Sequence, residues 1–284
     1  MPWIPLTVEH LGALMKFLGP REMHCAAFTE HLLENDRVTV PDAREYRVLI
    51  RVTSSGSVTG AILQSRSGLY YPVLSEAECQ VEEEALDPLK RATKRIYSVM
   101  GRLADVYALE RILPRQPSQA LEYHLMAQDE PPPELPLPRL PPDLVIHLST
   151  PDDAELLFPI QKQYELEEVL LPGSNFSPSA SLAHLRKVIA TQIVLHGTID
   201  GRPIAKAGTN ARGLFYDQVG GVFTDPAYRS RGVGTLLMLR LLSHIAGEQK
   251  TATLFVKKDN APAIAMYANL RFRMVDGFRI SYYR

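Results

Sequence analysis

Apolar positions in residues 144–284 change between helical and strand spacing several times. Leu182, Leu185 and Ile189 recur at intervals of three and four, the spacing of one helical face. Asp200-Gly201 separates two β-capable runs, which is typical of a hairpin turn. The pattern predicts a mixed α/β fold (α+β) in which helices flank a mostly antiparallel central sheet. The expected elements are strand 144–148, helices 150–169 and from 177, strands 192–198, 204–211 and 214–224, a helix ending at 247, strand 252–256, helix 260–269 and two closing strands within 273–283.

Residues 1–128 give the same order of elements. Gly56 and Gly68 lie in the expected turns between three consecutive strands. The shared order leads to the hypothesis of two copies of one fold, with an unrelated α/β domain as the alternative. The expected elements are helices 7–18 and 21–33, strands 46–53, 58–64 and 70–74, helix 81–91, strand 95–99, helix 102–113 and strand 122–127.

A proline-rich segment joins these two parts. Residues 129–143 contain seven prolines in fifteen positions. Proline fixes φ and removes backbone donors, so the segment is expected to be extended and semi-rigid, spanning up to about 46 Å. Either a spacer or a strap along the surface fits this composition. The expected division is therefore 1–128, linker 129–143 and 144–284.

Composition narrows the class of protein. No apolar run approaches the roughly 20 residues of a membrane span, and the N-terminus lacks the pattern of a signal peptide. Cys25 and Cys79 have no spacing typical of a metal site, so no metal is expected. Residues 144–284 carry 16 Lys and Arg against 12 Asp and Glu, a bias that suits a small anion and is too weak for nucleic acid. A cytoplasmic protein with no membrane partner is expected.

Residues 219–235 contain the strongest candidate for a binding site. A β-branched run ends at Asp225-Pro226 and is followed by Arg229, Gly232 and Gly234 before an apolar helix. A turn of this kind directs backbone N–H groups and the helix dipole at one point, as a diphosphate requires. Alone, the glycines could equally serve close packing of helix on strand. The sequence lacks both the P-loop and the dinucleotide fingerprint at this place.

A second motif lies one strand further along. Asn260, Ala263, Tyr267 and Phe272 follow the expected strand 252–256 at fixed spacing. Together with Arg229-x-x-Gly-x-Gly, they make residues 144–284 resemble the GNAT superfamily of N-acetyltransferases. Met266 stands where leucine is common in the family. Arg271 stands where glycine is usual, which leaves the end of that helix uncertain.

The resemblance implies the GNAT fold and acetyl-CoA as the acyl donor, and the repeated order of elements predicts two copies of this fold in tandem. The pantetheine arm would pair with the strand before the turn, and the diphosphate would lie on the turn. Asn260 would touch the arm, and Tyr267 would donate its proton or a hydrogen bond to the leaving thiolate. Asp217 is the candidate general base, with His196 a weaker one. The residues implied for the acyl-CoA site are Val222, Phe223, Thr224, Arg229, Ser230, Arg231, Gly232, Val233, Gly234, Thr235, Asn260, Ala263 and Tyr267.

The first part of the chain lacks the glycine turn. At the corresponding place, residues 75–86 read SEAECQVEEEAL, and an acidic helix start would repel a diphosphate. Residues 1–128 are therefore expected to be a degenerate GNAT-like domain that does not bind the donor. The expected activity is acetyl transfer to a primary amine of a small molecule or peptide. The alternative is a non-catalytic acyl-CoA sensor. Aminoacyl transfer from tRNA is disfavoured because a basic stripe is missing.

Overall fold

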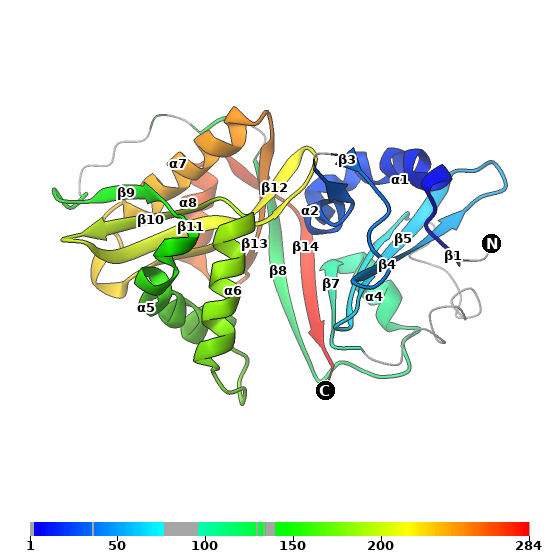
Figure 1. Ribbon diagram of the computed structural model, residues 1–284, viewed down its shortest axis with the longest axis horizontal. Coiled ribbons are helices and arrows are strands. Elements are labelled where there is room, and N and C mark those ends of the chain that lie inside the picture. The colour runs from blue at the N-terminus through cyan, green and yellow to red at the C-terminus, as the bar shows by residue number, and fades with distance from the viewer. Residues whose placement is uncertain are drawn as a thin grey trace.

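The computed structural model describes residues 3–35, 37–76, 96–128, 130–132, 134 and 140–283. Within these residues, one large sheet of twelve strands runs through the whole molecule (Figure 1). A separate two-stranded ribbon consists of β2 (Leu33–Glu34) and β3 (Arg37–Val38). The strands of the large sheet are β1 (Trp3–Pro5), β4 (Tyr46–Val52), β5 (Val58–Ser65), β6 (Leu69–Leu74), β7 (Ser98–Arg102), β8 (Gln119–Gln128), β9 (Val145–Leu148), β10 (Val194–Ile199), β11 (Arg202–Arg212), β12 (Tyr216–Thr224), β13 (Thr251–Lys257) and β14 (Phe272–Tyr282).

The strand order is β1-β4-β5-β6-β7-β14-β8-β13-β12-β11-β10-β9. The order is symmetric about the central pair β14–β8, because each half has one parallel pair, β6–β7 or β12–β13, and antiparallel pairs elsewhere. Two strands are exchanged between the halves. β8 comes from the first part of the chain and pairs with β13, whereas β14 comes from the end of the chain and pairs with β7. The proposed division at residues 129–143 thus separates segments of the chain and not halves of the sheet.

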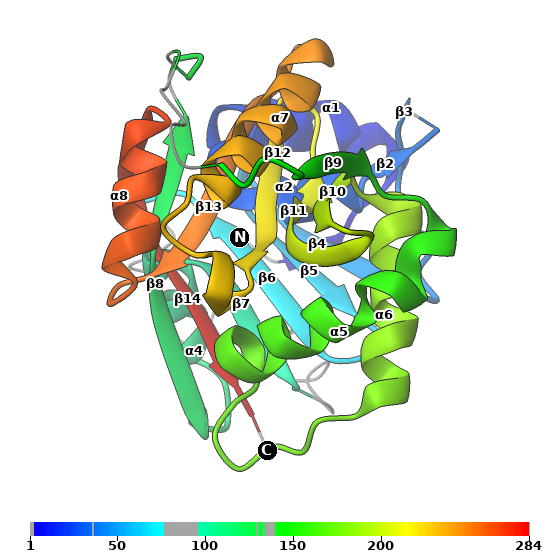
Figure 2. The same ribbon diagram turned by 90° about the vertical axis from the view of Figure 1, so that its left-hand side faces the viewer.

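Helices cover both faces of the sheet. In the C-terminal half, α5 and α6 pack on one face, where they form an apolar cluster with Phe223. On the other face, α7 and α8 contribute to a second cluster (Figures 1 and 2). No helix in the described part of the chain is long and apolar enough to cross a membrane. The α-helices are α1 (Leu11–Leu18), α2 (Glu22–Glu30), α4 (Leu103–Glu110), α5 (Ala154–Tyr164), α6 (Pro178–Thr191), α7 (Val233–Gly247) and α8 (Ala261–Asn269).

Local signals account for several of these boundaries. The Ser177 side chain accepts a hydrogen bond from the Ala180 N–H and begins α6, as its place before a proline predicts. Asp200 and Gly201 both have positive φ, +50° and +73°, so the expected tight hairpin joins β10 to β11. The expected helix over 150–169 is present as a 3₁₀ turn, α5 and a π-helical turn, η6 (Glu165–Val169).

Two expectations need correction. The two closing strands are a single strand, β14, because a register shift between Met274 and Asp276 bends it without ending it. The helix expected over 21–33 ends at Glu30, and the chain then enters the β2–β3 ribbon. The helix expected over 81–91, and the acidic segment from residue 77 onward, lie outside the described residues.

A buried carboxylate joins the first part of the chain to the second. Glu22 of α2 is fully buried and accepts hydrogen bonds from the Leu214 and Phe215 N–H groups, at 2.6 and 2.7 Å, and from Thr29. These amides belong to the turn between β11 and β12. A side chain on Gly213 would collide with this carboxylate, since its Cβ would lie 2.6 Å from the Glu22 oxygen. The strand before the predicted site is therefore held by the other half of the molecule.

Candidate functional site

The two strands of the parallel pair β12–β13 separate part-way along their length. They are in register from Tyr216–Thr251 to Val219–Leu254, and β12 then continues to Thr224 without a further partner on that side among the described residues. Beyond this point β13 stays paired with β8 on its other side. The second half of β12 therefore presents backbone N–H and C=O groups along an open edge. An extended amide-containing chain could pair with such an edge, as an added strand does.

A tight turn follows β12 and leads into α7. Ser230 and Gly232 both have positive φ, +59° and +82°, and Gly232 is the N-cap of the helix. Glycine adopts this left-handed conformation without a steric penalty. Gly232 offers no side-chain cap, and the first intrahelical hydrogen bond is donated by Leu236. The N–H groups of the first turn of α7 thus point out of the helix, as an anion site requires.

Gly234 lets α7 approach its neighbours closely. A Cβ at this position would lie 3.3 Å from the Thr224 hydroxyl and 3.6 Å from the Met266 sulfur. The turn, the end of β12 and the helix α8 therefore meet at one place. Val233 is buried beneath the turn, in the cluster that includes Tyr267.

Arg229 spans the gap between this turn and η6. Its guanidinium donates to the Thr224 carbonyl at 2.9 Å and forms an ion pair with Glu167 at 2.7 Å. On the β13 side, Lys257 pairs with Glu168 at 2.9 Å. Two adjacent carboxylates of η6 thus contact the turn after β12 and the end of β13, and an incoming anion would compete with Glu167 for Arg229. Arg231 lies over the Tyr228 ring.

The gap between β12 and β13, beyond the point where their pairing ends, is called the slot below. Helix α8 carries the second motif beside this slot. Asn260 is its N-cap, and its side chain accepts a hydrogen bond from the Ala263 N–H at 3.2 Å. Tyr267 is buried, packs against Phe272, and has no hydrogen-bond partner for its hydroxyl among the described residues. Burial raises the pKa of Tyr267, and the nearby Tyr164 and Glu168 raise it further. The phenol therefore stays uncharged at neutral pH, and its O–H can donate a hydrogen bond.

Asp217, the first candidate for the general base, does not lie at the slot. Asp217 is fully buried near the opposite end of β12, six residues before Phe223, and pairs with Lys250 at 3.2 Å and Arg212 at 3.6 Å. Burial raises its pKa, and Lys250 opposes this shift. At about 3.3 Å per residue, Asp217 is roughly 20 Å from the slot along the strand. His196 is buried on β10, where its ring hydrogen-bonds to Ser149 and stacks on His147.

Two buried side chains that the motifs do not contain lie at the slot. Lys206 of β11 donates to the Gly221 carbonyl at 2.9 Å and lies 4.3 Å from the centre of the Tyr164 ring. Tyr164, at the end of α5, packs edge-on against Phe223 and lies close to the Gly221 backbone. Burial lowers the pKa of Lys206 to about 8 and raises that of Tyr164 to about 12. A lysine inside the apolar strand 204–211 was the one sequence signal for this pair.

Comparison with known proteins agrees with this geometry. Residues 166–272 match the Acetyltransferase (GNAT) family. A 128-residue stretch is 39% identical to the N-alpha-acetyltransferase RimI of Mycobacterium tuberculosis, covering 44% of this chain and 78% of that protein. The chain belongs to the GNAT family. This assignment confirms the expected family and enzyme class, N-acetyltransferase.

Other relatives of this GNAT protein extend the comparison. A 63-residue stretch is 44% identical to mycothiol acetyltransferase from a Nocardioides species, and the match spans about a fifth of that protein, 21%. A Drosophila protein of solved structure aligns with 99% of this chain and 98% of its own, with 14% identity and a TM-score of 0.69. A tandem GNAT protein from the clavulanic acid biosynthesis pathway aligns equally far, with 15% identity and a TM-score of 0.56. These full-length likenesses confirm the expected fold class.

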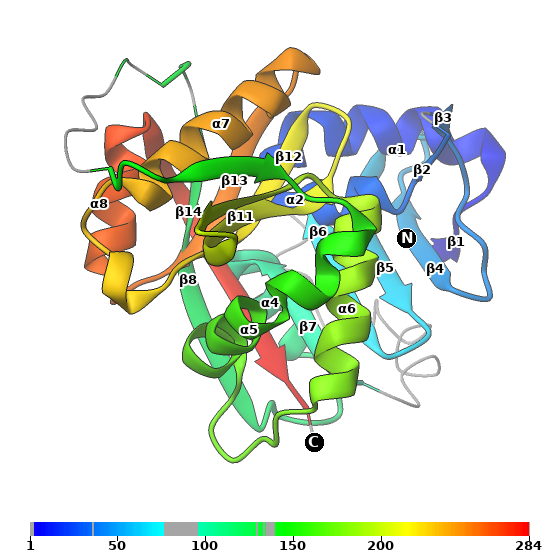
Figure 3. The ribbon, with the colours of Figure 1, turned by 60° about the vertical axis from the view of Figure 1, so that its left-hand side comes forward.

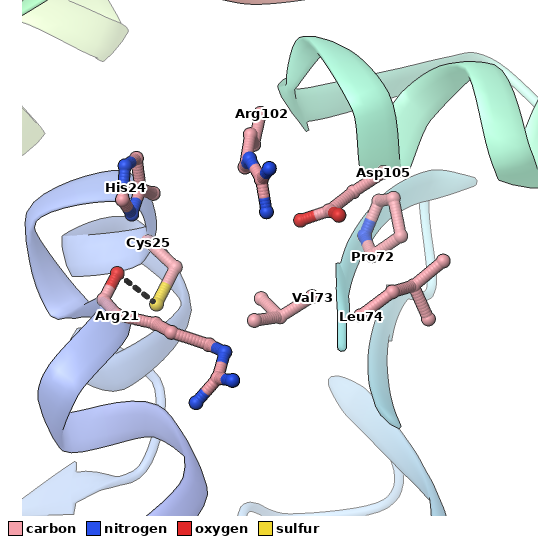
Figure 4. A pocket seen from close by; sticks show the side chains of 8 residues that line it. All are labelled: Arg21, His24, Cys25, Pro72, Val73, Leu74, Arg102 and Asp105. Atoms are coloured by element: carbon pink, nitrogen blue, oxygen red, sulfur yellow. Dashed lines mark hydrogen bonds between the residues drawn. The ribbon is translucent and has the colours of Figure 1, made fainter. Parts of the chain in front are cut away.

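The first half of this GNAT protein has a corresponding gap between parallel strands. β6 and β7 pair at Leu69–Ser98 and Tyr70–Val99 and then separate, leaving a cavity of about 40 Å³ (Figure 4). Arg102 reaches into this gap but is held by Asp276 at 2.8 Å and by Glu76. Such a volume holds only a few water molecules. The remaining lining residues are Arg21, His24, Cys25, Pro72, Val73, Leu74 and Asp105.

Proposed function

We propose that this protein transfers an acetyl group from acetyl-CoA to a primary amine of a small molecule or peptide. The observation that carries the proposal is the separation of β12 from β13 immediately before a glycine-capped helix start. An open strand edge suits the amides of a pantetheine arm, and the helix N-terminus suits a diphosphate. The two lie in the order in which acyl-CoA carries these groups.

The residues of the turn fit the anionic end of the donor. The N–H groups from Ser230 to Thr235 would hold the diphosphate, and Arg229 and Arg231 would add charge-assisted contacts. Arg229 would then exchange its Glu167 partner for a phosphate. Backbone groups of Val222, Phe223 and Thr224 would hold the pantetheine amides, and Asn260 and Ala263 at the start of α8 would flank the arm.

When bound, acetyl-CoA supplies the thioester that the neutral amine attacks directly. Tyr267 would donate a hydrogen bond or its phenolic proton to the leaving sulfur, since its phenol is protonated at neutral pH. The acceptor would approach from the face that carries α5 and η6, since α7 and α8 occupy the other face. Residues 1–128 are proposed as a GNAT-like domain that binds no acetyl-CoA, and 144–284 as the catalytic segment.

The decisive test measures binding and transfer separately. Titration calorimetry of the full chain with acetyl-CoA gives the stoichiometry, for which one site per chain is expected. Release of free thiol is then followed across a panel of small amines and peptides with free N-termini. Release above the rate without protein for any amine supports transfer. Tight binding without release for every amine would instead favour the acyl-CoA sensor, and no binding would overturn the proposal.

A further inference from the structure

Lys206 is a buried cation in the middle of β11. Lys206 is 6% exposed, and among the described residues no carboxylate lies within ion-pair distance of its ammonium, although Glu165 is near enough to raise its pKa. Burying a lysine without a close ion-pair partner lowers the stability of the folded state. Its contacts are instead the Gly221 carbonyl, at 2.9 Å, and the face of the Tyr164 ring. An apolar side chain of similar length would fill this space at lower cost, so filling space does not explain the lysine.

Lys206 and Tyr164 both lie beside Gly221, at a bulge of β12. The pairing of β11 with β12 shifts in register between Lys206 and Gly208, and Gly221 at this bulge has φ of +62°. This positive φ favours glycine, and a Cβ on Gly221 would also lie 2.9 Å from the Lys206 nitrogen. Lys206 donates to the Gly221 carbonyl, and its ammonium lies over the Tyr164 ring, which places Tyr164 beside the same bulge.

The held peptide lies where the slot opens. Pairing of β12 with β13 ends at Val219, so Gly221 is in the separated segment, next to the residues proposed to bind the pantetheine arm. The orientation of this peptide sets the direction of the neighbouring N–H groups of β12. Donors aimed at a reacting carbonyl accelerate acyl transfer only when their positions are fixed beforehand.

We propose that Lys206 is a positioning residue for the acyl group, which fixes the Gly221 peptide and the Tyr164 ring beside the thioester. This role rests on the proposed function. It differs from proton removal from the acceptor, because it acts on the donor and is needed whatever nucleophile attacks. Lys206→Met removes the ammonium and keeps the length of the side chain. Lys162→Met, at an exposed site of α5, is the matched control.

The first measurement needs no ligand. In Lys206→Met, the amide hydrogens of Phe223 and Asp225, which pair with β11 at or near Lys206, are expected to exchange about tenfold faster by NMR, because local opening becomes easier. Lys162→Met is expected to leave both rates unchanged. Tyr164→Phe, which removes only the hydroxyl beside Gly221, should accelerate the same amides and serves if Lys206→Met folds poorly. Unchanged exchange rates in both variants would overturn the claim that Lys206 and Tyr164 hold the bulge at Gly221 in place.

The second measurement uses hydroxylamine, a small nucleophile that is neutral at pH 7, with acetyl-CoA as donor. Wild-type protein is expected to accelerate thiol release, and Lys206→Met to lose about tenfold to a hundredfold of this acceleration. A base acting on the acceptor would not be needed here, so full activity of Lys206→Met overturns the positioning role alone. Wild-type protein that binds no acetyl-CoA overturns the proposed function and this role together, while the exchange result still reports on the clamp.

Discussion

Two buried side chains of opposite character lie at the slot, and burial shifts their pKa values in opposite directions. The pKa of Tyr267 is raised, so the phenol remains a proton donor at neutral pH. The pKa of Lys206 is lowered to about 8, so the ammonium loses its proton more easily than an exposed lysine. Both shifts disfavour charge at the place where the uncharged amine and the thioester would meet.

Tyr267→Phe is expected to lower kcat about a hundredfold and to leave the Kd for acetyl-CoA within about twofold. The ring contact with Phe272 is retained, and only the unpartnered hydroxyl is lost. Stopped thiol-release assays and calorimetry measure the two quantities. Tyr97→Phe, which removes an equally simple hydroxyl from a side chain that is 58% exposed, should change neither. A Tyr267→Phe protein with full kcat would show that another group protonates the thiolate.

Lys206→Met is expected to raise the free energy of unfolding at pH 7 by about 1–3 kcal/mol. The folded-state pKa of about 8 lies below the ordinary 10.5, so the native state carries the full cost of the buried charge below pH 8. As pH rises from 8 to 10.5 the native lysine is neutral while the unfolded one still binds a proton. The free energy of unfolding of the wild type therefore rises relative to that of the variant between pH 8 and 10.5, and the difference becomes constant above this range.

Urea unfolding at several pH values measures this difference. The groups that face Lys206 from the packed elements are Tyr164, Glu165 and His196, the residue opposite it on β10. They are the same in both proteins, so their titration cancels to first order in the comparison. If Lys206→Met were less stable than the wild type at pH 7, and by the same free energy at every pH, the lysine would instead stabilise the sheet.

At the scale of elements, the turn between β12 and α7 depends on the conformation of Gly232. Gly232→Ala places a Cβ on a residue with φ of +82°, which is expected to cost about 1–2 kcal/mol of stability and to weaken acetyl-CoA binding several-fold. Gly247→Ala at the other end of the same helix meets no atom within 4 Å and is the matched control. It should leave binding unchanged. Equal acetyl-CoA affinity in the two variants would remove the turn from the binding site.

The turn and α8 could be predicted from the sequence because their signals are local. Asp225-Pro226, Gly232 and the Asn260 cap each determine backbone geometry within a few residues. The Lys206–Tyr164 contact could not be predicted, since it joins residues 42 positions apart through the packing of α5 on the sheet. Asp217 was placed correctly on its strand, but its ion pairs with Lys250 and Arg212 depend on tertiary structure.

The arrangement of the sheet was only partly predictable for a similar reason. The predicted order of helices and strands described the elements of each half, and the repetition of this order predicted two copies of one fold. No local sequence pattern indicates that β8 and β14 are exchanged between the halves. An antiparallel strand has the same alternation of apolar and polar residues whichever strand it pairs with. The shift near Asp276 hid the continuity of β14 in the same way. Figure 3 shows the two strands side by side between the halves.

At the scale of the whole molecule, the exchanged strands join the two hydrophobic cores. Met126 of β8 belongs to the core of the C-terminal half, whereas its neighbour Leu125 belongs to that of the N-terminal half. Phe278 of β14 is fully buried in the N-terminal core. Glu22 adds a polar link by binding the β11–β12 turn. Neither half is complete without a strand from the other part of the chain.

Splitting the chain at the proline-rich segment is therefore expected to give two fragments that fold only together. Fragment 129–284 lacks β8, which leaves a long unpaired edge on β13 and removes Met126 from its core. Expressed alone, it should aggregate, whereas co-expression with 1–128 should give a one-to-one complex on size exclusion. Fragment 119–284, which differs only by keeping β8, is the matched comparison and should be markedly more soluble. Two fragments that are each monomeric and melt cooperatively alone would mean that the pairing of β8 with β13 is dispensable and that the two segments are independent domains.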